Sequence, residues 1–332
     1  MHFPDWQREK WHDHPANPLI TPEGVKQPDK YGVLGDPQVI LPGEFDDRWH
    51  MFIIGHAHFY RLDSTDGVHW DLVYDNMWTA GPPCVTCDGE KWIVLYSLHG
   101  WPDASSPGNW KLDWRRESVI VGRTSTDLLH WSEPVQVVAP VLDWEREGER
   151  IQVRNPNLVM LPDGKFRLYY CGGTVMMHDM GFEEPKYIGV AEADSALGLY
   201  VKREKPVLGP SPDIWYRNHG AGAIKVFRFG DAFLALENGI YIDPENRTHS
   251  AINVLMSEDG IAWQDASYNP IVIPSGNGWN KSHIYQLDLR WYDGKLWLFY
   301  NARDGWSPAR EFIGLSTLEW DGPAPEKMWR LR

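Results

Sequence analysis

The residues of this chain that could do acid–base chemistry are carboxylates and histidines spread over almost its whole length. Asp36 stands directly before Pro37, Glu237 lies 201 positions further on, and Asp304 is close to the C-terminal end. A pair of carboxyl groups, one protonated and one ionised, is the equipment that cleaves glycosidic bonds. Because the residues are so far apart in the sequence, they form one site only if the fold brings the ends of distant strands together.

A repeated unit supplies such a fold. The turn at residues 64–70 (STDGVHW) returns at 125–131 and 257–263, with weaker versions at 193–200 and 315–320. Upstream of each turn lies a pair of short β-type runs around a tight turn. Five repeats of about four strands, with no convincing helix between them, predict an all-β five-bladed β-propeller with four antiparallel strands per blade. A pair of β-sandwiches is the alternative that we keep open.

We expect one domain over residues 1–332. Residues 1–30, rich in Pro, Trp and polar residues, read as an N-terminal lead-in whose strand-like piece is at 19–21. The predicted blades cover residues 32–76, 80–138, 150–206, 217–269 and 281–322.

In a propeller the first strand of each blade begins at one face of a central channel, where the second strand ends. The candidate site residues all fall at such positions or in the loops beside them, and long loops are expected at about 98–117, 173–186 and 238–249. They are Asp36, Arg154, Asn155, His219 and His283 from strand starts; His56, His99, Glu237, Arg303 and Asp304 from strand ends; and Trp101 from a loop.

The composition of the chain limits the classes of molecule that we expect it to bind. The formal net charge of −14 argues against nucleic acid and anionic membranes, both of which require clustered Lys and Arg. The 19 Trp residues fit a carbohydrate ligand, because sugars present flat apolar faces. The first ten residues lack the layout of a signal peptide, and three cysteines form no disulfide framework, so we expect a cytoplasmic protein of undetermined oligomeric state.

Cys84 and Cys87 have the CxxC spacing of some metal and redox sites. They fall on a predicted strand, where a separation of three points them to opposite faces. Buried structural thiols are therefore expected.

The residues 35–37 (GDP) at the start of the first blade resemble the motif of glycoside hydrolase family 43, whose relatives include families 117 and 130. The resemblance spans about residues 30–322. It implies a five-bladed glycosidase in which Asp36 is the general base, and a furanoside or pentoside substrate such as an α-L-arabinofuranoside or β-xyloside. That family places an Asp at the third blade and a Glu acid in the fourth, where this chain has Asn155 and residues 218–222 (NHGAG).

The missing acid leaves two candidates, Glu237 and His219, the second by resemblance to family 117. Asn155, Arg154, His56, His99, Trp101, His283, Arg303 and Asp304 would bind substrate. His283 resembles the channel histidine that helps to hold a metal ion, so calcium in the channel is a further expectation, with no cofactor required for catalysis. A phosphorylase of the family 130 type and a non-catalytic carbohydrate-binding propeller remain alternative functions.

Overall fold

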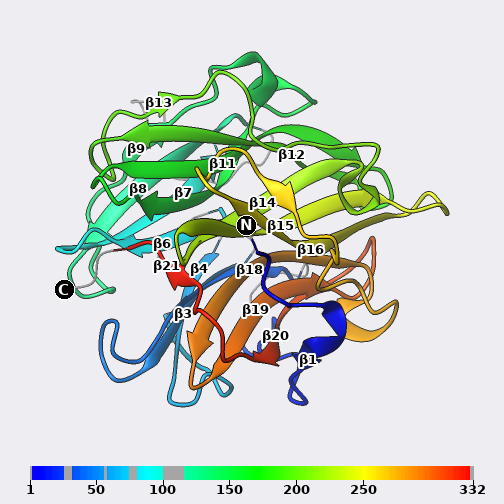
Figure 1. The fold of residues 1–332 in the computed structure, drawn as a ribbon, viewed down its shortest axis with the longest axis horizontal. Helices are drawn as coiled ribbons and strands as arrows, with labels where there is room; N and C mark the ends of the chain where they lie inside the picture. Colours follow the sequence, from blue (N-terminus) through cyan, green and yellow to red (C-terminus); the bar gives the residue numbers. More distant parts are fainter. Residues whose placement is uncertain (1, 26–31, 56–57, 75–80, 100–115, 330–332) are drawn as a thin grey trace.

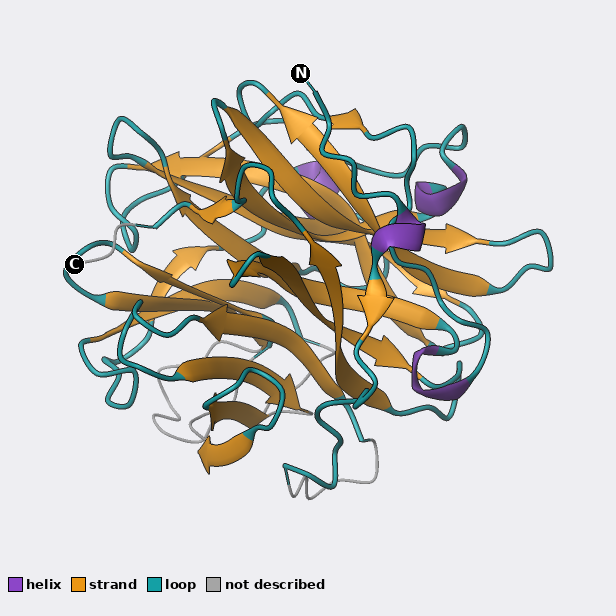
Figure 2. Ribbon diagram, turned by 60° about the horizontal axis from the view of Figure 1, so that its bottom comes forward, coloured by secondary structure: helices purple, strands orange, loops and turns teal. Residues whose placement is uncertain are grey.

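The structure, a computed structural model, describes residues 2–25, 32–55, 58–74, 81–99 and 116–329 and is built almost entirely of β-strands. The ordered segments outside the strands include four short 3-10 turns: η1 (Arg8–Lys10), η2 (Asp143–Arg146), η3 (Trp215–Arg217) and η4 (Gly278–Asn280). Figure 2 shows these turns as small purple coils on a body of strands. The all-β class predicted from the sequence is confirmed.

The strands pair with their neighbours in the sequence, as antiparallel meanders. Three sheets have four strands each: β2 (Leu34–Ile40), β3 (Trp49–Gly55), β4 (His58–Ser64) and β5 (Asp71–Tyr74); β6 (Pro83–Cys87), β7 (Trp92–His99), β8 (Ser118–Ser125) and β9 (Val135–Val138); β10 (Val153–Met160), β11 (Phe166–Met177), β12 (Phe182–Ala193) and β13 (Val201–Lys202).

A nine-stranded sheet contains the remaining strands, and it divides into two meanders joined by a single parallel bridge between Ser250 and His283. Its strands are β14 (Gly220–Phe229), β15 (Ala232–Ile242), β16 (Thr248–Ser257) and β17 (Gln264–Asp265); β18 (His283–Tyr292), β19 (Lys295–Arg303), β20 (Glu311–Glu319) and β1 (His12–Asp13); and β21 (Glu326–Lys327).

Side chains of the first strands bond to the backbone of a neighbouring first strand. Gln38 on β2 accepts from the amide of Val85 on β6, and Asn157 on β10 accepts from Val226 on β14. Asp288 on β18 accepts from Val39 on β2, which links the last meander to the first. These bonds satisfy buried backbone groups that have no partner in their own sheet at those positions.

Both ends of the chain are built into sheets far from them in the sequence. β1 pairs with β20, and Trp6 and Trp11 are buried in the core between the last two meanders. The N-terminal segment is therefore an integral part of the last meander, and its strand lies at 12–13, whereas Ile20 makes only an isolated bridge. Figure 1 shows the blue β1 beside the red-orange β20.

The C-terminal strand β21 pairs with β14, and Lys327 forms an ion pair with the fully buried Asp288 at 2.5 Å. Burial lowers the pKa of Lys327, and the Asp288 carboxylate opposes that shift. The oxygen of Asp288 that holds Lys327 is also the one that accepts from Val39, so the C-terminal segment neutralises the carboxylate that joins β18 to β2.

The structure also bears on the expectations for the cysteines and for the long loops. Cys84 and Cys87 are buried free thiols in two different core clusters, as expected for opposite faces of β6. Two of the expected long loops are mainly strand, because β11 and β12 extend to Met177 and from Phe182, and β15 and β16 extend to Ile242 and from Thr248. The helices of the described residues are too short or too polar to span a bilayer.

We predict that Lys327→Met lowers the free energy of unfolding by about 3 kcal/mol, because it leaves the buried Asp288 carboxylate without a counter-charge. The matched control, Lys295→Met, removes the exposed ion pair with Glu319 and should leave the free energy of unfolding almost unchanged. Urea unfolding followed by circular dichroism measures both. Equal stability of the two variants would contradict the role assigned to Lys327.

Candidate active site

The site begins with an irregularity shared by four of the five first strands. The antiparallel register slips where each first strand starts, and the residues left out of the pairing are Asp36–Pro37, Asn155–Pro156, Gly222 and Tyr285–Gln286. A bulge turns its unpaired residue away from the sheet, and such bulges recur beside active sites. Equivalent positions of four meanders therefore present Asp36, Asn155 and Tyr285 to the region where the first strands meet.

Asp36 has a left-handed backbone, with φ of +59°, and Asn155 has φ of +54°. Asp and Asn tolerate this conformation better than other residues that carry a side chain, and non-glycine residues in it cluster at functional sites. The backbone N–H of Asp36 donates to Asn301 and the Asn155 amide donates to the Gly222 carbonyl, so contacts from adjacent strands hold both residues in place.

Asp36 is only 8 % exposed, and burial raises the pKa of its carboxyl group to about 7. Lys225 and Arg154 oppose this rise through their positive charges, whereas the carboxylates of Glu311 and Glu184 add to it. A carboxyl with a pKa near 7 exchanges protons readily at neutral pH, which is the property required of an acid–base catalyst.

Glu184 and Glu311 complete a cluster of three carboxyl groups. Arg154 donates to Glu184 at 2.9 Å, and Arg303 donates to Glu311 at 3.1 Å. Burial raises the pKa of Glu184, and it raises the pKa of Glu311 to about 7, with the arginine charges opposing each rise. The three carboxyl groups thus lie close enough to influence one another, with two of them already paired to guanidinium groups.

Other polar groups of the cluster are buried without hydrogen bonds among the described residues. They include the Lys225 ammonium, the Asn155 side-chain oxygen and the Nε2 of His283. Burial raises the pKa of the Tyr285 phenol well above its ordinary value, and the Glu184 carboxylate adds to the rise. Buried polar atoms without partners are costly, so a concentration of them at one place is a property of ligand-binding sites.

The side chain of Lys225 also lines a small cavity beneath the cluster. The cavity has a volume of about 20 Å³, which is room for about one water molecule. Its walls come from every first strand and from the C-terminal segment, and include Gln38, Cys84, Asn157, Lys225, Asp288 and Met328. The C-terminal segment therefore closes the region of the first strands on the side away from Asp36.

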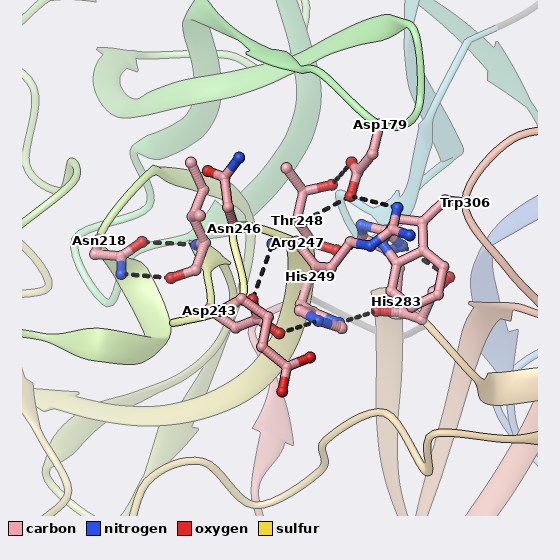
Figure 3. Close-up of polar contacts among 12 residues, drawn as sticks. Asp179, Asn218, Asp243, Asn246, Arg247, Thr248, His249, His283 and Trp306 are labelled. Carbon is pink, nitrogen blue, oxygen red and sulfur yellow. Dashed lines mark hydrogen bonds and ion pairs between the residues drawn. The ribbon is translucent and has the colours of Figure 1, made fainter.

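Polar contacts among residues of the third, fourth and fifth meanders form a wall that includes His283 (Figure 3). Thr248 is its central residue: its backbone N–H and hydroxyl donate to Asp179 on the β11–β12 hairpin, and its carbonyl accepts from the Trp306 indole. The Arg247 guanidinium lies over the Trp306 ring at 4.8 Å. Residues from three meanders are therefore held by one backbone position.

A stack of rings leads from this wall to the cluster. His249 stacks on Tyr241 at 5.3 Å, lies 6.0 Å from His283, and His283 stacks on Tyr285 at 5.5 Å. Burial lowers the pKa of His283 well below its ordinary value, with the charge of Arg303 adding to the effect, so its ring is neutral. The stack fixes the position of the Tyr285 phenol.

The structure places Glu237 in a different cluster. Its carboxylate accepts from Asn253 at 2.7 Å and lies 3.4 Å from Arg217, which also binds Asp265. Burial raises the pKa of Glu237 to about 7, and the charges that modify it are those of Arg217 and Asp265. Asp36 and Glu237 are thus held by separate sets of partners.

The candidates still to be placed are His219, Asp304, His99, His56 and Trp101. His219 contacts the Met176 carbonyl, and Asp304 accepts from the Arg310 amide to close the β19–β20 turn. His99 is buried, which lowers its pKa to about 3, and the Arg154 charge adds to this shift. His56 and Trp101 lie outside the described residues.

The described residues contain no group of three or more His, Cys, Asp or Glu side chains with the geometry to hold a metal ion. The expectation of a calcium ion beside His283 finds no such ligand set there. The lone Nε2 of His283 is a weak basis for a hard cation, which prefers oxygen ligands.

Sequence reasoning missed Glu184, Glu311, Lys225 and Tyr285. The first two stand near the start of third strands, β12 and β20, which begin at the same edge as the first strands. Neither is at a first-strand start or a second-strand end, although Glu184 falls within the loop expected at 173–186. The expectation that strand starts at this edge line the site, when it is extended to third strands, finds both residues. Each is an acidic residue at the opening of a β-type run.

No family model and no curated protein match the chain. Solved structures do, at low identity. An N-acetylgalactosamine deacetylase from F. plautii, solved with blood group B trisaccharide, is 13 % identical over 93 % of this chain and 95 % of its own, with a TM-score of 0.65. A thermostable family-43 glycoside hydrolase is 18 % identical over 90 % and 96 %, with a TM-score of 0.59.

A third solved structure is 12 % identical and comes from the GH130 family of mannoside phosphorylases. That family is described as containing glycoside hydrolases that target β-1,2 mannosidic linkages in Candida mannan. The structure covers 98 % of this chain and 99 % of its own, with a TM-score of 0.66. The chain therefore shares the fold of the family 43 and family 130 structures that its sequence resembles.

We predict that Asp36→Asn changes how stability depends on pH. The pKa of Asp36 is about 7 in the folded protein and near 3.8 when unfolded, so the unfolded chain releases this proton first as pH rises. Its contribution to stability is therefore lost progressively between about pH 4 and pH 7. Asparagine does not titrate. Relative to the wild type, the variant should gain about 2 kcal/mol between pH 5 and pH 8 in urea unfolding; identical pH dependence would contradict the shifted pKa.

Proposed function

We propose that the chain is a glycoside hydrolase that removes a terminal sugar held over the starts of the first strands. In this proposal the five meanders close into a five-bladed propeller of four-stranded blades. The bonds between successive first strands, including the one from Val39 to Asp288, support closure. Solved structures with the same fold, which are described as glycoside hydrolases, support the class of reaction.

The observation that carries the proposal is the buried Asp36 in its left-handed conformation, with a pKa of about 7 and two further carboxyl groups close by. A structural capping residue would need neither feature. Three carboxyl groups with raised pKa values among positive charges provide both the protonated and the ionised form at neutral pH.

In the proposed inverting reaction the ionised Asp36 takes a proton from water while the water oxygen attacks the anomeric carbon. A protonated carboxyl gives its proton to the departing oxygen as the glycosidic C–O bond breaks. Glu184 and Glu311 are the candidates for this acid, because burial favours their protonated forms and the charges of both raise the pKa of Asp36. Glu237 is less suited because it belongs to the separate cluster around Arg217. His219 is less suited because its ring contacts the Met176 carbonyl.

The resemblance to family 43 makes furanosides and pentosides, such as α-L-arabinofuranosides and β-xylosides, the first substrates to test. The shared fold with a mannoside-active structure makes β-mannosides the second. Binding of the sugar would use Arg154, Asn155 and Tyr285, which stand at or beside the first-strand positions equivalent to that of Asp36.

A phosphorylase is the second candidate, and Lys225 is the observation in its favour. Its buried ammonium has no hydrogen-bond partner among the described residues, so it could contact a phosphate. Arg154 and Arg303 are each already paired with a glutamate, which leaves little positive charge for an added dianion. Hydrolysis is therefore favoured.

We expect Asp36→Asn to reduce the hydrolysis of the best substrate in a panel of aryl glycosides at least a thousandfold, with the circular dichroism spectrum unchanged, because removal of a general base removes this order of rate enhancement. The control, Glu319→Gln, changes an exposed carboxylate on β20. Near-normal turnover by Asp36→Asn would exclude Asp36 as the base. Sugar binding without cleavage across the panel would favour a non-catalytic protein.

Phosphate separates the two enzymatic alternatives. For a hydrolase, we expect the same rate of cleavage with and without added inorganic phosphate, and the free sugar as product. Formation of a sugar 1-phosphate, detected by chromatography of the products, would establish the phosphorylase instead.

The acid is identified from pH profiles. If Glu311 is the acid, Glu311→Gln removes the alkaline limb of the kcat/KM profile, which should lie near pH 7 because the pKa of Glu311 is about 7. The same result with Glu184→Gln would assign the role to Glu184. Loss of that limb in Glu237→Gln alone would restore Glu237 as the acid.

A further inference from the structure

We propose that Trp215 forms a distal sugar-binding subsite, so that the substrate is an oligosaccharide reaching from Asp36 outward over the fourth meander. The inference rests on the proposed function for its location, but it concerns a surface that the catalytic proposal does not use. It starts from an unusual exposure: the Trp215 side chain is 53 % exposed, in the 3-10 turn η3 directly before β14.

The indole of Trp215 packs against two tyrosine rings in T-shaped contacts. Tyr216 meets it at 80° with ring centroids 5.5 Å apart, and Tyr241 meets it at 86° and 5.2 Å. Edge-to-face contacts of this kind fix an aromatic ring in one orientation. An exposed indole held in a fixed orientation is suited to stack against the apolar face of a sugar ring, because little entropy is lost on binding.

A buried ion-pair cluster anchors the turn that carries Trp215. Arg217, the last residue of η3, binds Asp265 at 2.8 Å and Glu237 at 3.4 Å, and Tyr216 donates to Asp265. Fully burying Glu237 is expensive unless its charge is compensated. The cluster thus gives Glu237 a positioning role: it holds η3, and with it Trp215, against β15.

Trp215 lies on the same edge of the sheets as Asp36. η3 precedes the start of β14, and Tyr241 stands near the end of β15, whose Ile240 pairs with Gly220 at that start. From Tyr241 the stacked rings of His249 and His283 lead to Tyr285, beside the carboxyl cluster. A continuous series of rings therefore joins the exposed indole to the candidate active site.

The test measures binding in the absence of cleavage, on an Asp36→Asn background. The probes are xylo-, arabino- and β-1,2-manno-oligosaccharides of each length from disaccharide to hexasaccharide, titrated by calorimetry. Trp215→Ala should weaken binding of the longest bound oligosaccharide about tenfold, which corresponds to about 1.4 kcal/mol, and leave disaccharide binding unchanged. Trp291→Ala is the matched control, because Trp291 is 41 % exposed near the other end of a first strand, β18.

Affinity that does not depend on oligosaccharide length, or equal effects of Trp215→Ala and Trp291→Ala, would overturn the subsite. A change of oligomeric state in Trp215→Ala with unchanged sugar affinity would overturn it in favour of a contact between copies of the chain. The proposed function fails independently, if the wild-type protein binds these oligosaccharides and cleaves none of them.

Discussion

The interaction on which the rest of the structure depends is the neutralisation of buried charge where the first strands meet. Asp36, Glu184 and Glu311 are all largely removed from water, and such a group of carboxyl groups is tolerated only beside cations. Arg154 and Arg303 come from different meanders and supply two of these cations. Burial raises the pKa values of these carboxyl groups and the cations limit the rise, so the contacts that make burial tolerable also set how the groups titrate.

Below this cluster the same principle holds the meanders together. Asp288 accepts from Val39 and pairs with Lys327, so one carboxylate links the last first strand to the earliest one and to the C-terminal segment. Above it, Thr248 connects hairpins of three meanders through Asp179 and Trp306. The candidate catalytic groups are thereby fixed from both sides, and preorganised groups of this kind need no rearrangement during a reaction.

The all-β class was predictable because the repeated turn at 64–70 has a local cause: the side chains of Ser64 and Asp66 accept from backbone amides within the turn. Asp36 was predictable from its place before Pro37. Glu184 and Glu311 were not, because their importance arises from which strand ends come together. Glu237 was expected at the end of a second strand, but β15 continues to Ile242 and the Glu237 side chain faces Arg217. The direction of a side chain depends on a register that the sequence does not display.

The pairing of β1 with β20 has a consequence for biosynthesis. β1 is translated about 300 residues before its partner β20, and contacts so distant in the chain make folding slow. Until then the indoles of Trp6 and Trp11 have no core to enter, and exposed apolar segments of nascent chains are the ones that associate wrongly. We therefore expect the N-terminal segment to stay open to wrong association until β20 has been translated.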